Sequence, residues 1–68
     1  MKYVVVYERA PRNWAAYVPD LPGCVATGKT RAAVKRHIRE AIQLHIETMR
    51  EAGEAIPEPG DATELIEV

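Results

Sequence analysis

The chain has 68 residues, a formal net charge of −1, one cysteine and no phenylalanine. This length predicts a single domain, 1–68, that buries only about 60% of its unfolded surface, so we expect self-association into a dimer or tetramer. One cysteine excludes an intrachain disulfide and favours a reducing, cytoplasmic location. The apolar N-terminal run is too short for a signal peptide, no stretch is apolar and long enough to predict a membrane span, and the near-neutral charge predicts no general attraction to nucleic acid.

Two segments near the N-terminus have the composition of strands. Residues 3–7 are β-branched or aromatic, and their odd- and even-numbered side chains face opposite ways. Both faces are apolar, so one can pack on a helix while the other needs a cover, most simply a second subunit. A polar loop, 9–13, has a length that suits a hairpin and leads to a second strand, 14–18.

Residues 17–25, with the sequence YVPDLPGCV, organise the rest of the chain. Pro22 and Gly23 fit the two central positions of a type II turn, because proline presets φ and glycine accepts a positive φ. Asp20 can accept hydrogen bonds from backbone N–H groups just ahead of it. A short third strand, 24–27, is expected after the turn, and Gly28 ends it.

A long amphipathic helix is predicted from residue 31 to about residue 52. Thr30 is a good N-cap and Gly53 a natural residue for the position after the C-cap, although Ala33 stands where a capping box needs Glu. At 1.5 Å per residue the helix is about 33 Å long, so we expect its C-terminal end to project beyond so small a sheet. Its apolar stripe comprises Val34, Ile38, Ala41, Ile42, His45, Met49 and Ala52.

The C-terminal residues predict a stiff connector and a last strand. Residues 55–60 contain two prolines, and residues 63–68 read as a strand. The predicted fold is therefore α+β, a single β-β-β-α-β domain in which an antiparallel three-stranded meander is followed by a crossover helix and a C-terminal strand. A right-handed crossover makes the fourth strand parallel to the first, whose open edge can receive it from its own chain or from a neighbour.

No residue pattern predicts catalysis. His37 and His45 are two helical turns apart, too far to bind one metal together, and no Cys/His ligand set is present. We expect His45 to be partly buried, satisfied by a hydrogen bond or a subunit contact, and His37 to be solvated. Cys24 is expected to be a small, buried, inert thiol. The sequence thus predicts no enzyme, no metal and no cofactor.

The charges of the helix are divided between its two halves. Three interpretations remain open: a solvated face, two copies pairing antiparallel so that salt weakens the dimer, or contacts with phosphate or with a basic protein. The bases are Lys29, Arg31, Lys35, Arg36 and Arg39; the acids are Glu47, Glu51 and Glu54.

The order of the motifs resembles the HicB-like antitoxin family over about residues 3–60. A first strand precedes Pro19-Asp20-Leu21-Pro22-Gly23-Cys24, followed by Thr27-Gly28, one helix and Ile56-Pro57-Glu58-Pro59. Family members usually carry acidic residues where this chain has Arg31-Ala32-Ala33-Val34, so its helix begins with more positive charge. The resemblance implies a truncated ribonuclease H-like fold that lacks the catalytic carboxylates.

The resemblance also implies a function: binding and sterically blocking a small RNA-cleaving toxin of the HicA type. Many members add a DNA-binding module, which we do not expect here because the chain ends at Val68. Partner contacts, or their support, are assigned to Tyr17, Asp20, Leu21 and Pro22, secondarily to Glu47, Glu51 and Glu54, with Pro19, Gly23, Cys24 and Pro57 as structural positions. The alternatives are a nucleic-acid-binding module that uses the basic half of the helix, and a regulatory domain that binds a small ligand between subunits.

Overall fold

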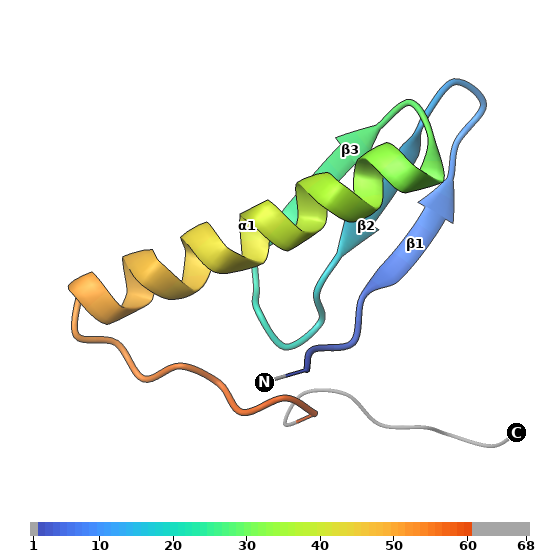
Figure 1. The fold of residues 1–68 in the computed structure, drawn as a ribbon. Helices are drawn as coiled ribbons and strands as arrows, with labels where there is room; N and C mark the ends of the chain where they lie inside the picture. The colour runs from blue at the N-terminus through green and yellow to red at the C-terminus, as the bar shows by residue number, and fades with distance from the viewer. Residues whose placement is uncertain (1, 61–68) are drawn as a thin grey trace, which may run out of the picture.

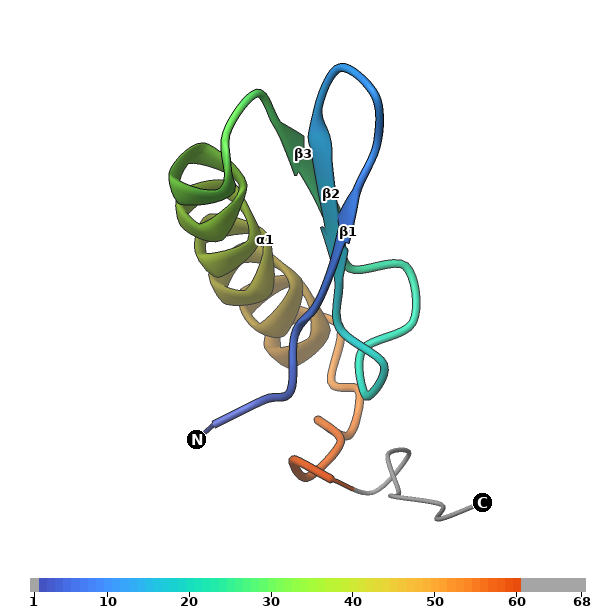
Figure 2. The same ribbon diagram turned by 90° about the vertical axis from the view of Figure 1, so that its right-hand side faces the viewer.

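The computed structural model describes residues 2–60, which form a three-stranded sheet with one helix packed on it. In Figures 1 and 2 the helix lies along one face of the sheet. Both pairs of neighbouring strands are antiparallel, in the order β1-β2-β3. The meander-plus-helix part of the predicted α+β fold is confirmed, whereas the expected fourth strand falls outside the described residues. The elements are β1 (Val6–Arg9), β2 (Trp14–Tyr17), β3 (Val25–Gly28) and α1 (Arg31–Glu51).

The first strand begins later than residues 3–7 predict. Its pairing runs from Val6 opposite Tyr17 to Arg9 opposite Trp14, and the hairpin loop is closed by a 2.9 Å bond from the Ala10 N–H to the Asn13 carbonyl. The ladder stops at Tyr17 because the chain then turns away at the proline-rich segment, so residues 3–5 have no strand partner there. The predicted alternation is correct nonetheless, since Tyr3, Val5 and Tyr7 all pack against the core.

Two consecutive turns follow β2. The Leu21 N–H bonds to the Val18 carbonyl at 3.1 Å, and the Cys24 N–H bonds to the Leu21 carbonyl at 3.0 Å. Gly23, at the third position of the second turn, has φ of 84°, which confirms the predicted type II geometry. The turns fold Leu21 and Cys24 inward, where both are buried.

The helix has the two ends that the sequence predicts. The Thr30 hydroxyl accepts a 3.0 Å bond from the Ala33 N–H, and Ala52 is the C-cap. Gly53 has φ of 72°, and the Glu54 N–H reaches back to the Met49 carbonyl at 2.9 Å, as in a Schellman motif. The C-terminal half of α1 extends past the strands, as expected from its length (Figure 1).

The core lies between α1 and the inner face of β2 and β3. The apolar stripe predicted for the helix is wrong at two positions: Ile46 packs against the core although it was not assigned to the stripe, and Ala52 is exposed. Ala52 follows the last helical residue, on the part of α1 that has passed the sheet, so no core is left for it to cover. The buried apolar residues are Ala16, Val18, Leu21, Cys24, Val34 and Ile38.

The connector after α1 is held against the sheet at two points. The Tyr3 hydroxyl donates to the Pro57 carbonyl at 2.7 Å. The Gly60 N–H donates to Asp20 Oδ2, also at 2.7 Å. The predicted acceptor role of Asp20 is thus observed, but the printed donor is far along the chain and not just ahead of it.

The face of the sheet opposite α1 is apolar, as the first strand predicted. The pairing aligns Val6, Tyr17 and Val25 in one row across the three strands. Tyr17 is 38% exposed and Val25 is 64% exposed, and Val4 adds to the same face at 47%.

Candidate functional site: a groove between the Pro-Gly turn and the helix

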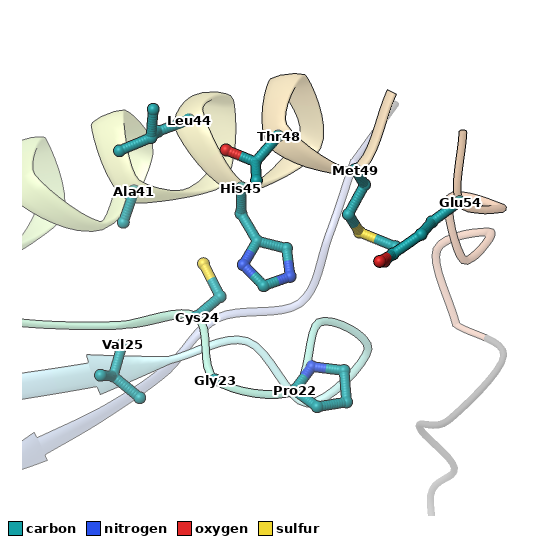
Figure 3. A pocket seen from close by; sticks show the side chains of 10 residues that line it. All are labelled: Pro22, Gly23, Cys24, Val25, Ala41, Leu44, His45, Thr48, Met49 and Glu54. Atoms are coloured by element: carbon teal, nitrogen blue, oxygen red, sulfur yellow. The ribbon is translucent and has the colours of Figure 1, made fainter. Parts of the chain in front are cut away.

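A groove of about 620 Å³ separates the proline-glycine turn from the C-terminal half of α1 (Figure 3). We call it the turn–helix groove. The type II turn positions one wall, and the projecting part of α1 supplies the other. Its lining residues are Pro22, Gly23, Cys24, Val25, Ala41, Leu44, His45, Thr48, Met49 and Glu54.

The groove offers apolar surface with a few polar groups. Leu44 and Val25 are the most exposed large hydrophobic residues among those described, at 65% and 64%. The His45 ring projects from α1 toward the side of the groove that carries Cys24 (Figure 3). Glu54 supplies a carboxylate where the chain leaves the helix. Such a surface suits a protein segment that carries an apolar side chain and a cation.

The chemistry of the lining is that of binding. Burial raises the pKa of the Cys24 thiol, so at neutral pH the sulfur is the protonated, weakly nucleophilic form. No group of three His, Cys, Asp or Glu side chains within residues 2–60 could hold a metal ion.

The structure joins two separately predicted sets of partner residues. Pro22, from the turn, and Glu54, from beyond the helix, both line the turn–helix groove. Tyr17 lies on the opposite side of the molecule, on the sheet face that α1 leaves open. Glu47 and Glu51 are exposed on α1 outside the lining.

Two of the predicted contact residues are not surface. Asp20 is 2% exposed and Leu21 is 1% exposed. Of the two roles that the sequence left open for them, surface or support, burial leaves support: Leu21 fills the core below the turn and Asp20 binds the connector. Among the structural positions, Gly23 makes the turn, Cys24 fills the core and Pro57 accepts the bond from Tyr3.

Sequence reasoning did not single out Leu44 or Val25. Leu44 does carry a signal: it is a leucine off the apolar stripe of the helix, between Gln43 and His45. Val25 had been expected as part of a strand, and only the pairing shows that it points away from α1.

The bases of the helix are partly engaged. The Arg31 guanidinium lies over the Tyr7 ring, 4.5 Å from its centroid, which fits a cation–π contact. His37 is exposed, as expected, but its Nδ1 also lies 2.7 Å from the Thr27 carbonyl oxygen. His45 is half-buried, as predicted. The other bases, Lys29, Lys35, Arg36 and Arg39, are exposed.

The fold and the groove are those of a small α+β binding domain, and comparison with known proteins shows which one. The family model described as HicB-like antitoxin of bacterial toxin–antitoxin systems matches residues 3–67. The chain therefore belongs to the HicB-like antitoxin family, and the resemblance inferred from its motifs is confirmed. The family connects it with a toxin–antitoxin role and a toxin protein as partner.

Individual relatives agree with this assignment. A UPF0150 protein of Thermoplasma acidophilum is 38% identical over 58 residues, 84% of each chain. An uncharacterised 14.9 kDa protein of Haemophilus phage HP1 is 33% identical over 97% of this chain, which spans only half of that relative's length. The crystal structure of TTHA0281 from Thermus thermophilus is similar with a TM-score of 0.74 and 29% identity, over 93% of this chain and 82% of the other.

One further property bears on where the protein acts. In the part of the chain that the structure describes, no helix combines the length and the apolar character that crossing a membrane would require.

Proposed function

We propose that the protein is an antitoxin that binds a HicA-type RNA-cleaving toxin and blocks it sterically, and that the turn–helix groove is the contact surface. The observation that carries the proposal is the family match over residues 3–67. It is supported by the two most exposed large hydrophobic side chains, Leu44 and Val25, both of which line the groove.

The charges near the groove fit such a partner. A protein that cleaves RNA needs cations to hold phosphates. Glu54 lines the groove, and Glu47 and Glu51 are exposed on the same half of α1. These acids would attract the cationic surface of the toxin, while the apolar lining supplies most of the binding energy. Covering that surface excludes RNA without any reaction by the antitoxin.

The experiment is a calorimetric titration with the toxin encoded beside this gene, made inactive by mutation so that it can be purified. We expect Leu44→Ala to weaken binding about tenfold or more, since central apolar contacts dominate such interfaces. Glu54→Lys should weaken binding further and make the loss smaller in high salt.

Matched controls lie away from the groove. Val4→Ala shortens another exposed apolar residue, and Glu8→Lys reverses another exposed acid; both should bind within about twofold of the original chain, as residues outside an interface do. Equal losses from Val4→Ala and Leu44→Ala would move the interface to the open sheet face. No binding by the unaltered chain would refute the toxin assignment.

A further inference from the structure

The outer edge of β3 carries a short set of outward backbone groups. The Val18 N–H bonds to the Cys24 carbonyl at 3.1 Å. Because hydrogen-bonded and non-bonded pairs alternate along an antiparallel ladder, Ala26 and Gly28 also direct their groups toward β2. Val25 and Thr27 then direct theirs outward, and the approach of His37 Nδ1 to the Thr27 carbonyl shows this orientation directly.

Apolar side chains flank this edge on both sides. Val25 stands on the open face of the sheet and Leu44 on α1, and each exposes nearly two thirds of its surface. Both line the turn–helix groove, which runs beside the start of β3. An edge with outward N–H and C=O groups between two exposed apolar residues is suited to pairing with another strand.

We propose that a second copy of the chain pairs with this edge, antiparallel and about a two-fold axis at Ala26. Val25 then lies opposite Thr27 of the second copy, and Ala26 lies opposite its equivalent. This register uses the outward groups of Val25 and Thr27 in both copies. The Thr27 carbonyl keeps a second lone pair beside His37. A register centred on Val25 would require Gly23 to pair, and its φ of 84° is not extended.

The charges of α1 support a second copy as the occupant. A two-fold axis perpendicular to the sheet places the two helices on the same side of it, running antiparallel. The basic half of each helix, with Lys35, Arg36 and Arg39, then runs alongside the acidic half of the other, with Glu47 and Glu51. The same register sets Lys29 of one copy opposite Gly23 of the other, beside the groove. The inference does not depend on toxin binding.

Cysteine cross-linking tests the register. Directly opposed residues of a non-hydrogen-bonded pair have Cα atoms about 4.5 Å apart, within the range for a disulfide. In a Cys24→Ala background, Ala26→Cys should therefore form a covalent dimer under mild oxidation. Val25→Cys in the same background should not, because Val25 opposes Thr27 and lies about 8 Å from its own equivalent. Cross-linking at Val25 but not at Ala26, or at neither, would overturn the proposal.

Sedimentation velocity tests the pairing itself. The unaltered chain should sediment as a dimer of twice its 7.6 kDa mass. Thr27→Pro removes an outward N–H and should yield a folded monomer, whereas Arg9→Pro, on the outer edge of β1, should remain dimeric. Circular dichroism checks that both variants fold, and the cross-linking result stands even if Thr27→Pro does not. A monomeric unaltered chain at every concentration would also overturn the proposal.

Discussion

At the scale of single residues, Gly28 shows how close packing depends on the absence of a side chain. A Cβ at this position would lie 2.6 Å from the Val34 backbone nitrogen and 3.0 Å from its Cα. Val34 is fully buried in the first turns of α1. The glycine that the sequence marks as the end of a strand is therefore also the point where the helix meets the sheet.

We predict that Gly28→Ala lowers the free energy of unfolding by about 1–3 kcal/mol, because the backbone of α1 must move to admit the methyl group. Urea denaturation measures the loss. Gly23→Asn is the comparison, since a Cβ there meets open space and asparagine tolerates a positive φ; it should cost less. If the two variants lost equal stability, the close approach of Val34 would not be the cause.

Cys24 leads to a prediction about pH. Burial raises the pKa of its thiol in the folded state, so folding favours the protonated form. This contribution is fully present below the unfolded pKa, about 8.5, and is lost as the pH rises through the higher folded value.

The stability difference between the unaltered chain and Cys24→Ala should accordingly be constant from pH 6 to about pH 8 and then decrease toward pH 10. Urea denaturation of both proteins across this range measures it, and other titrating groups cancel in the difference. Parallel pH profiles up to pH 10 would show that the thiol ionises equally easily in both states.

At the scale of elements, α1 shows how far local signals reach. Thr30 and Gly53 were predicted as its two ends, and both act as predicted, since a cap satisfies backbone groups within a few residues of itself. The start of β1 was misplaced because strand limits depend on a partner strand. Residues 3–5 have strand composition, yet the ladder ends at Tyr17, where β2 ends and the chain turns away.

We predict that Thr30→Ala lowers the free energy of unfolding by about 1 kcal/mol, because the Ala33 N–H loses its acceptor at the basic end of the helix. Thermal denaturation followed by circular dichroism measures the change. Thr30→Ser keeps the hydroxyl and should stay near the original stability. A loss as large in Thr30→Ser as in Thr30→Ala would assign the effect to the methyl group of the threonine.

At the scale of the whole molecule, the groove depends on how the connector and the turn are held. Asp20 binds the Gly60 N–H and Tyr3 binds the Pro57 carbonyl, so the segment after α1 lies back along the end of the sheet (Figure 2). Asp20 belongs to the turn that forms one wall of the groove, and Glu54 lies where the connector begins. A buried residue of the family motif thus shapes the surface without being part of it.

The amino-acid sequence alone determined the features that rest on nearby residues. The type II turn at Pro22-Gly23, both helix ends, the alternation of the first strand and the motif order that indicates the family all follow from short-range sterics and hydrogen bonding. Tertiary structure alone decided that Asp20 and Leu21 are buried, that Pro22 and Glu54 line one groove, and that Leu44 and Val25 stand exposed beside an open strand edge. Burial and proximity depend on which distant segments pack together, and no local pattern records that.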